Sequence, residues 1–453
     1  MCELSGPGEE VLPGAYVIAD DFTGACDTGV LFRSAGVSVS VELDAAEFAH
    51  SPRPDRLGNI LGPVKVILTD TRTMEPDVAA AVAESMGRRI RELGASDAYQ
   101  KIDSTMRGNV GAEIEALLTG LGRTAAVLCP AFPAMGRTVR QGILFVDGKP
   151  VTQTQYARDP RNPIDADALA DIVHATAPEL DVVAVTRDAL AAAIDSASGG
   201  HLVLVVDAET DADLDEIAGV LAQRRDVLPV GAAGLARALA REWAADLAPA
   251  PAAEPLALGR IILASGSANP RSIEQLQLLE DIGLEIVRLD KRELTTDEGA
   301  EREGKRALEQ LLRQAADAPL VAVALTDQRV EVPPGRGPFE RFVAEVVADF
   351  VAAVDADPHA TAVIVAGADT CRSVCRVLDT ERLVPVREIL TGIPWSESDR
   401  GFHFVSKAGG FGNINALADV IEFCRSALRP EIRSNEQCQS PSRTSVPRSS
   451  SSR

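Results

Sequence analysis

At about 150 residues per domain, the 453 residues of the chain suggest two or three domains. The composition, 46% hydrophobic and 25% charged, is typical of a globular protein, and the net charge of -22 opposes general attraction to nucleic acid or anionic membranes. No apolar run reaches the length of a bilayer and the first ten residues lack the pattern of a signal peptide, so we expect a cytoplasmic protein.

Short β-branched runs alternate with Ala- and Leu-rich helical stretches in both halves of the chain. Strands are expected within residues 15–21, 64–71, 125–132, 181–186 and 202–210, and then within 259–267, 284–290, 319–326 and 361–370. This alternation is typical of α/β domains with largely parallel sheets. Ligands on such sheets bind outside the carboxyl ends of the strands, so polar residues that follow a strand are the first candidates for a site.

A Pro- and Ala-rich segment divides the chain. Residues 247–258 have no periodic apolar face and are expected to be a linker. We therefore expect an N-terminal domain over residues 14–246 and a C-terminal domain over 259–425, each a largely parallel sheet flanked by helices. Residues 426–453 are polar and of low complexity, which indicates a disordered tail.

The first expected strand ends in an acidic turn, DDFTGACD. It places Asp20, Asp21 and Asp27 between the strand and the following helix, together with Gly24. One aspartate at a helix start is most simply an N-cap, but each unpaired carboxylate near a buried strand end costs desolvation energy. Gly24 would allow close backbone approach, and the helix N-terminus offers free N–H groups. We therefore expect a binding site at this turn.

The second candidate site is the stretch KIDSTMRGNVGAEIEALL. Seven positions hold Lys101, Asp103, Ser104, Thr105 and Arg107, and glycines and an amphipathic helix follow. Arg72, after the strand expected at 64–71, could add a cationic contact. Arginine presents a planar fork to a carboxylate and lysine a mobile charge, so the set suits a hydroxylated acid. The alternative is a solvated surface loop, which the glycines and the helix start disfavour.

A third segment, residues 129–151 with Arg137 and Arg140, is either the rigid wall of a pocket or an ordinary connection.

Three glycine-containing loops follow strands in the second half. They carry Ser265 and Ser267, then Gly367 to Thr370, then Lys407, Gly409 and Gly410. Such loops fit a cradle in which backbone N–H groups approach phosphates. Neither a P-loop nor a dinucleotide fingerprint is present. The five histidines are scattered outside these motifs, which gives little support to a hydrolase or a zinc enzyme.

Taken in order, these motifs resemble the four-carbon acid sugar kinase family. The matching pieces, between residues 16 and 423, are ADDFTGACDTG, KIDSTMRGNVGAEIEAL, PAFPAMGRT, RDPRNP, AAGLA, SGSANP, AGADT, TGIP and SKAGGFG. The resemblance implies an ATP-dependent kinase with an N-terminal acid-sugar-binding domain and a C-terminal nucleotide-binding domain, both α/β. Its substrate would be threonate, erythronate, 3-oxo-tetronate or a related acid such as 3-oxo-isoapionate, phosphorylated on a terminal hydroxyl.

The resemblance also implies positions for the two ligands. The substrate would contact Asp20, Asp21, Arg72, Lys101, Ile102, Asp103 and Ser104, to which the residue pattern adds Arg107. The nucleotide would contact Ser265 or Ser267, Gly367, Ala368, Asp369, Thr370, Gly409 and Gly410, with Lys407 assisting. The sequence departs from the family pattern at Cys26, Ala232 and Ala366, where relatives usually have Asn, Ser and Gly. Cys26 could thereby help to select the substrate.

A mechanism follows from what phosphoryl transfer requires, namely an aligned hydroxyl, an orienting carboxylate and positive charge. Asp21, or Asp103 as the alternative, would orient and deprotonate the hydroxyl, while Arg72, Lys101 and Arg107 hold the substrate carboxylate. Mg²⁺ is expected to bridge the ATP phosphates. The partners expected are the acid sugar and ATP, without nucleic acid or membrane, and a homo-oligomer is left open. The alternatives are a kinase of another small hydroxy acid or sugar, or a non-catalytic metabolite-binding homologue.

Overall fold

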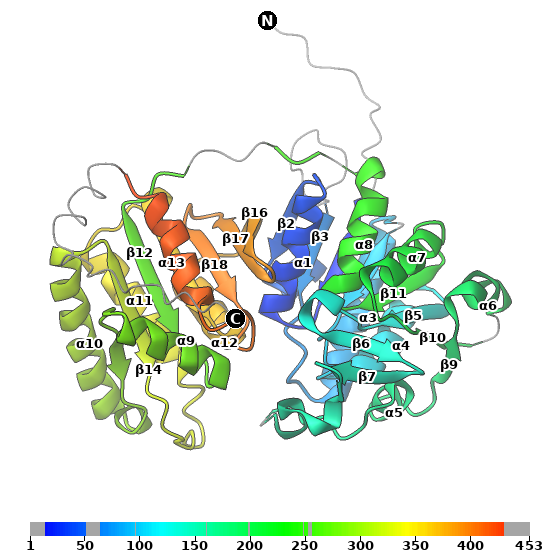
Figure 1. Ribbon diagram of the computed structural model, residues 1–453, viewed down its shortest axis with the longest axis horizontal. Helices are drawn as coiled ribbons and strands as arrows, with labels where there is room; N and C mark the ends of the chain where they lie inside the picture. The colour runs from blue at the N-terminus through cyan, green and yellow to red at the C-terminus, as the bar shows by residue number, and fades with distance from the viewer. Residues whose placement is uncertain are drawn as a thin grey trace, which may run out of the picture.

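One mixed sheet runs through both halves of the protein (Figure 1). The computed structural model describes residues 14–50, 64–95, 97–159, 161–197, 200–247, 249–251 and 256–429. Within these ranges the sheet has 15 strands in the order β13-β14-β12-β15-β18-β17-β16-β2-β3-β1-β4-β11-β5-β10-β9. Helices cover its faces, as expected of an α/β protein. No helix in the described ranges is both long and apolar enough to cross a bilayer.

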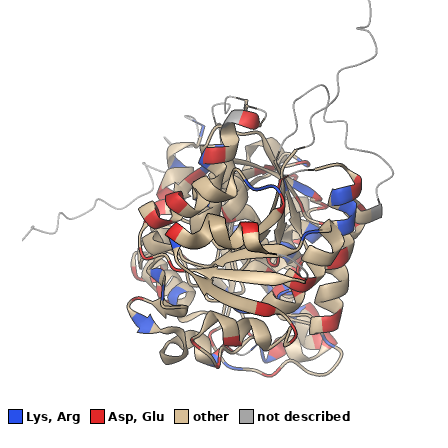
Figure 2. Cartoon of the chain, turned by 90° about the vertical axis from the view of Figure 1, so that its right-hand side faces the viewer, with Lys and Arg blue, Asp and Glu red and all other residues tan. Residues whose placement is uncertain are grey.

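The N-terminal half contributes eight strands of this sheet, all parallel to their neighbours within that half. In chain order they are β1 (Tyr16–Ala19), β2 (Val39–Glu42), β3 (Val64–Leu68), β4 (Ala98–Lys101), β5 (Ala125–Cys129), β9 (Asp181–Val185), β10 (Leu202–Val206) and β11 (Val227–Gly231). The helices are α1 (Phe22–Ser34), α2 (Ala45–His50), α3 (Pro76–Glu92), α4 (Val110–Leu121), α5 (Leu169–His174), α6 (Leu190–Ser196), α7 (Asp211–Leu221) and α8 (Ala233–Trp243). Figure 2 shows the charged residues mostly on the helices and loops around largely uncharged central strands, which matches their burial.

The C-terminal half contributes parallel and antiparallel strands. They are β12 (Arg260–Ser265), β13 (Val287–Leu289), β14 (Leu320–Leu325), β15 (Thr361–Ala366), β16 (Arg382–Leu390), β17 (Ile393–Ser398) and β18 (His403–Lys407). The helices are α9 (Pro270–Asp281), α10 (Asp297–Asp317), α11 (Glu340–Ala353), α12 (Ala368–Val377) and α13 (Ala416–Ser426). All nine strands expected from the sequence are present, and the α/β fold class is confirmed.

The two halves are joined within the sheet. Strand β16 pairs antiparallel with β2, with Leu383 opposite Val41, and α1 packs against β16, β17, β18 and α12. Cys26 of α1 is fully buried in this contact, where Ser406 of β18 is its hydrogen-bond partner. The proposal that Cys26 helps to select the substrate therefore gains no support from its position, because the thiol faces the other half of the protein.

The first residues of the expected disordered tail, 426–429, belong to the folded C-terminal half. Ser426 ends α13, and Leu428 is buried in the core of the C-terminal half beside Leu258. Residues 430–453 lie outside the described residues. Of the expected linker, Ala250 donates its backbone N–H to Gly36 O at 2.7 Å, so this part of it lies along the end of α1.

The segment after β5 forms a separate small antiparallel sheet. Its strands are β6 (Arg137–Arg140), β7 (Ile143–Val146) and β8 (Lys149–Pro150), and the 3-10 turn η3 (Gln155–Arg158) follows. The sequence left open whether residues 129–151 wall a pocket or simply connect two elements. Arg137 Nη2 donates to Tyr156 Oη at 2.8 Å, and Tyr156 also lies under the guanidinium of Arg107 at 5.2 Å. The small sheet therefore supports η3, whose Tyr156 contacts Arg107 of the second candidate site.

Candidate functional site

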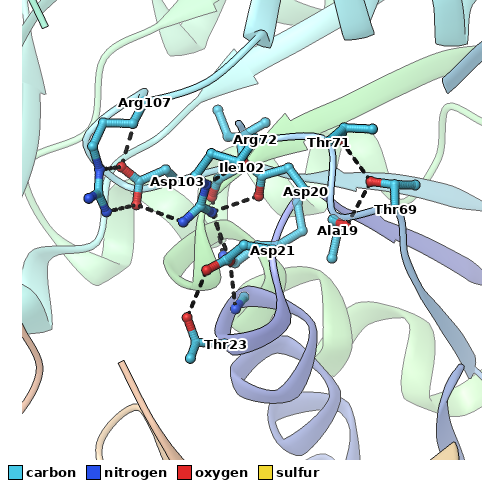
Figure 3. Close-up of polar contacts among 12 residues, drawn as sticks. Ala19, Asp20, Asp21, Thr23, Thr69, Thr71, Arg72, Ile102, Asp103 and Arg107 are labelled. Atoms are coloured by element: carbon cyan, nitrogen blue, oxygen red, sulfur yellow. Dashed lines mark hydrogen bonds and ion pairs between the residues drawn. The ribbon is translucent and has the colours of Figure 1, made fainter. Parts of the chain in front are cut away.

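Polar residues of the N-terminal half converge because their strands end together (Figure 3). Ala19, the last residue of β1, is level with Leu68 of β3 and with Lys101 of β4 in the parallel register. The residues after these strand ends are therefore neighbours, although up to about eighty positions separate them along the chain. This is the edge at which ligands of open α/β sheets bind.

Arg72 joins Asp20 and Asp21, which precede α1. The third aspartate, Asp27, was expected in the same turn but lies inside α1, because the helix already begins at Phe22. Arg72 Nε and Nη2 donate to Asp20 Oδ2 and Oδ1, each at 2.7 Å, and Nη2 also donates to Asp21 Oδ1 at 2.7 Å. Burial raises the pKa of Asp20 more than Arg72 lowers it. Although burial also acts on Asp21, Arg72 and Lys101 hold the pKa of that carboxyl below its usual value. Asp21 additionally caps α1 by accepting the N–H of Gly24 at 2.9 Å, so the capping explanation and the site explanation both hold.

Asp103 lies on the other side of Arg72 and is almost fully engaged. It accepts Arg107 Nε at 2.7 Å and Nη2 at 3.1 Å, and it also accepts the hydroxyl of Thr105. Arg72 Nη1 is 3.9 Å from Asp103 Oδ1. Burial alone would raise the pKa of Asp103, but Arg107 and Arg72 hold it well below the usual range. Asp103 is therefore a carboxylate at every pH near neutrality.

Lys101 points into the same cluster from the end of β4. Its side chain is 5% exposed, and Nζ donates to Ile102 O at 3.2 Å and lies 3.7 Å from Asp27 Oδ1. Burial raises the pKa of Asp27 to about 6 despite Lys101. A Cβ at position 24 would lie 2.8 Å from Lys101 Nζ, which is why a glycine stands there. Ile102 is fully buried, so it can offer a ligand only its backbone.

A further carboxyl, Glu113 of α4, lies behind this cluster. Gln100 Nε2 donates to its Oε2 at 3.3 Å, and burial raises the pKa of Glu113 to about 8. Glu113 belongs to the second candidate stretch, but the sequence pattern assigned it no role. The sequence feature that could have revealed Glu113 is an acidic residue on the face of α4 whose other residues are mostly apolar and buried.

The second cluster is formed by the strand ends of the C-terminal half. Ser265 of β12 is level with Ala366 of β15, which is level with Lys407 of β18. The backbone N–H of Gly266 donates to Thr370 Oγ1 at 3.1 Å. Gly367 has a φ of 105°, which a larger side chain would disfavour, and it leads directly into the N-terminus of α12. The three glycine-containing loops of the sequence thus lie together at one edge.

Lys407 supports these loops from within. Its side chain is fully buried, and Nζ donates to Ala408 O at 2.9 Å and to Gly409 O and Phe411 O, each at 3.2 Å. Burial lowers its pKa to about 7. Lys407 therefore stabilises the loop that carries Gly409, and backbone carbonyls occupy its ammonium.

The two clusters face one another across the boundary between the halves. Arg161 Nη1 contacts Asp369 Oδ2 of α12 at 2.8 Å, and Arg372 of α12 pairs with Asp70, which follows β3. A Cβ at position 410 would lie 3.8 Å from Tyr156 Oη. The sequence assigned no role to Asp159 and Arg161, although both lie in the motif RDPRNP, whose signals are its charges and its match to the family pattern.

Known proteins resemble the chain over nearly its whole length. A family model described as a sugar-binding N-terminal domain matches residues 15–239, and one described as a nucleotide-binding C-terminal domain matches residues 262–417. A D-threonate kinase of Bordetella bronchiseptica is 31% identical over 436 residues, which are 91% of this chain and 98% of the relative. A 3-oxo-tetronate kinase of Methylobacterium radiotolerans is 29% identical over 89% of this chain and 98% of its own length. A D-erythronate kinase of Heliobacterium modesticaldum is 35% identical over 46% of this chain and 48% of its own length.

Solved structures share the fold. A crystal structure from Salmonella typhimurium LT2 has a TM-score of 0.71 at 24% identity and covers 90% of this chain and 98% of its own. One from Haemophilus influenzae has a TM-score of 0.64 at 22% identity, with 91% and 99% covered. Both therefore support the arrangement of strands and helices described above.

Proposed function

Because the chain belongs to the four-carbon acid sugar kinase family and is therefore an ATP-dependent carbohydrate-acid kinase, we propose that it phosphorylates a terminal hydroxyl of threonate, erythronate, 3-oxo-tetronate or a related four-carbon acid. One observation supports this most directly. The polar cluster around Arg72 and the glycine-containing loops around Gly367 belong to different halves of one chain, yet two ion pairs bring their edges together. A phosphoryl group can pass between two ligands only if their sites adjoin.

The chemistry of the first cluster suits a small hydroxy acid. Asp20, Asp21 and Asp103 present carboxylate oxygens that can accept substrate hydroxyls, and Arg72 holds all three in place. Lys101 provides an ammonium with three N–H donors, which suits the substrate carboxylate. With a neutral sugar this ammonium would keep Ile102 O at 3.2 Å and Asp27 Oδ1 at 3.7 Å, whereas a substrate carboxylate could meet it at hydrogen-bond distance.

Asp21 is better placed than Asp103 to orient the reacting hydroxyl. Asp103 is occupied by the fork of Arg107 and by Thr105. Asp21 Oδ2 accepts only the mobile hydroxyl of Thr23, at 2.9 Å, among the contacts of the described residues. A substrate hydroxyl can therefore approach Asp21 Oδ2 with little rearrangement. We assign Asp21 as the carboxylate that receives the hydroxyl proton.

The second cluster suits ATP with Mg²⁺. Backbone N–H groups of the loops at Gly367 and Gly409 and the N-terminus of α12 would receive the phosphates. Asp369 and the nearby Glu340, whose side chain lies over Gly266, are the carboxylates that could hold Mg²⁺. The described residues hold no group of three or more ligand side chains, so the phosphates would complete the coordination, as is common for this ion. When bound, Mg²⁺ neutralises charge on the β- and γ-phosphates.

A cytoplasmic location accords with this activity, because ATP is available there. The cysteines that the structure describes, Cys26, Cys129, Cys371, Cys375 and Cys424, are all free and buried. Thiols remain reduced in the cytoplasm.

The test is ADP release with a panel of acids and matched neutral compounds. The panel holds both enantiomers of threonate and erythronate, 3-oxo-tetronate, 3-oxo-isoapionate, glycerate and the neutral tetritols. We expect turnover with at least one four-carbon acid and phosphorylation of its terminal hydroxyl, located by ³¹P NMR of the product. Equal turnover with acid and tetritol would contradict the role of the cationic cluster. Thermal stabilisation by an acid without any ADP release would identify a binding protein instead.

A further inference from the structure

The segment that carries Asp159, Arg161 and Asn162 is attached to the substrate cluster. Asp159 Oδ1 accepts the backbone N–H of Arg161 at 3.0 Å and that of Asn162 at 2.9 Å. The other oxygen, Oδ2, accepts Arg107 Nη1 at 2.9 Å. Since Arg107 also holds Asp103, the backbone position of Arg161 is set by the residues proposed to bind the acid sugar.

From this segment the side chain of Arg161 extends to the C-terminal half of the protein. Its Nη1 lies 2.8 Å from Asp369 Oδ2, in the first turn of α12 and two residues after Gly367. The side chains of Arg161 and Asp369 are 45% and 52% exposed, so neither is fixed by burial. Tyr156, three residues before Asp159, touches the position of Gly410 in the neighbouring loop. The Arg161 guanidinium therefore lies at the edge of the loops proposed to hold the phosphates.

Of the other cations in the two clusters, Lys101 is assigned to the substrate carboxylate and Arg372 pairs with Asp70. Three more are engaged by other groups. Arg72 serves Asp20 and Asp21, and Arg107 bridges Asp103 and Asp159. The ammonium of Lys407 is buried among backbone carbonyls. Phosphoryl transfer spreads negative charge over the three equatorial oxygens, and a guanidinium is well suited to bind two of them at once.

We propose that Arg161 contacts the phosphoryl group during its transfer, as a catalytic residue that the substrate half supplies to the nucleotide half. This inference rests on the proposed kinase function. In the step, the bond between the γ-phosphorus and the β–γ bridging oxygen breaks and ADP leaves. A bond forms between the γ-phosphorus and the substrate hydroxyl oxygen, whose proton passes to Asp21. Arg161 forms no covalent bond. Its guanidinium leaves the carboxylate of Asp369 and binds the phosphoryl oxygens, which are also negatively charged.

The matched pair of variants is Arg161→Ala and Arg158→Ala, because Arg158 is an exposed arginine three residues before Arg161, at the end of η3. We expect Arg161→Ala to lower kcat by about 10²–10³-fold, as the loss of one transition-state contact does. The KM for the acid should stay within about threefold, because kcat reports an interaction made in the transition state. Guanidinium ion in the buffer should restore part of kcat to Arg161→Ala and none to the unsubstituted protein. Arg158→Ala should keep full activity.

A second measurement separates this role from that of a simple bridge between the halves. Aluminium fluoride with ADP and the acid mimics the transferred phosphoryl, and Arg161→Ala should weaken this complex by about 10²-fold while leaving the affinity for ADP alone within about threefold. An equal loss of affinity for both, at an unchanged melting temperature, would mean that Arg161 acts only through Asp369 and would overturn the proposal. A kcat within about threefold of that of Arg158→Ala would also overturn it. Absence of turnover in the unsubstituted protein would reject the proposed function and this inference together.

Discussion

Removal of the Arg72 side chain should destabilise the N-terminal half and should do so in a pH-dependent way. Three hydrogen bonds of 2.7 Å join its guanidinium to Asp20 and Asp21. The side chains of Arg72, Asp20 and Asp21 are only 13%, 3% and 10% exposed. Arg72→Ala leaves two carboxylates with little water and without their cation. Breaking a buried pair on one side costs about 3–5 kcal/mol. At about 2–4 °C per kcal/mol for a domain of this size, the melting temperature should fall by about 6–20 °C.

The sign of the pH dependence follows from Asp20. Its pKa in the folded protein already lies above the usual value, and loss of Arg72 raises it further. Between the unfolded and folded pKa values the folded state holds a proton that the unfolded state has released, so stability falls as pH rises through that window. The cost of Arg72→Ala should therefore be smaller at pH 5 than at pH 8.

Urea unfolding followed by circular dichroism at both pH values measures this cost. The control is the double variant Asp20→Asn with Arg72→Ala, which removes one of the stranded charges and should recover part of the stability. If Arg72→Ala lowered the free energy of unfolding by less than about 1 kcal/mol, or by the same amount at both pH values, the reasoning would be refuted. Such a result would mean that water screens Arg72 and its partners as it does surface ion pairs.

Three further predictions concern other parts of the two clusters. Asp21→Asn should lower kcat by about 10²–10³-fold with little change of the KM for ATP, and near-normal turnover would rule Asp21 out as the proton acceptor. Glu113→Gln should flatten the pH dependence of stability, measured by thermal melts from pH 5 to 9. The pKa of Glu113 is raised to about 8, so its contribution is present below the unfolded pKa of about 4.3 and is lost as pH rises through 8. An unchanged pH profile would contradict this. Gly409→Ala would place a Cβ 2.6 Å from Ser267 Oγ, and should raise the KM for ATP but not that for the acid. Equal effects on both would place this loop away from the nucleotide.

The sequence predicted strands in which apolar residues predominate, even where one charged residue such as Lys65 of β3 interrupts them, and it missed strands with a weaker pattern. Strand β4 contains Gln100 and Lys101, β11 contains Pro229, and β16 alternates buried with exposed residues such as Val384. These strands are stabilised by neighbours that lie far away in the sequence, so their own residues carry little local signal. The link between the halves through β16 and β2 was unpredictable for the same reason.

For the polar cluster of the N-terminal half, the sequence pointed to most of the side chains that the structure brings together, but not to their pairing. Parallel strands bring their carboxyl ends to one edge, so Asp20 and Arg72 can be grouped from the sequence alone. Lys101 ends β4, a strand that the sequence did not predict, and it was added only through its polar neighbours and the family resemblance. The contacts of these residues depend on strand order, which local patterns do not encode. Arg72 was expected to hold the substrate carboxylate, and the structure shows that its fork is already used by Asp20 and Asp21.

The ion pairs of Arg72 and Arg107 limit which groups of this acidic protein can bind the carboxylate of an acidic substrate. Asp20, Asp21 and Asp103 neutralise the guanidinium groups, so an incoming carboxylate finds no surplus positive charge there. The remaining cation is Lys101, whose Nζ is 3.7 Å from Asp27 Oδ1, beyond hydrogen-bond distance. Burial raises the pKa of Asp27 to about 6, so this carboxyl takes up a proton more readily than an ordinary aspartate when a second anion approaches. The cluster therefore favours a substrate with several hydroxyls for the carboxylates and a single carboxylate for Lys101, which is the functional-group pattern of a four-carbon sugar acid.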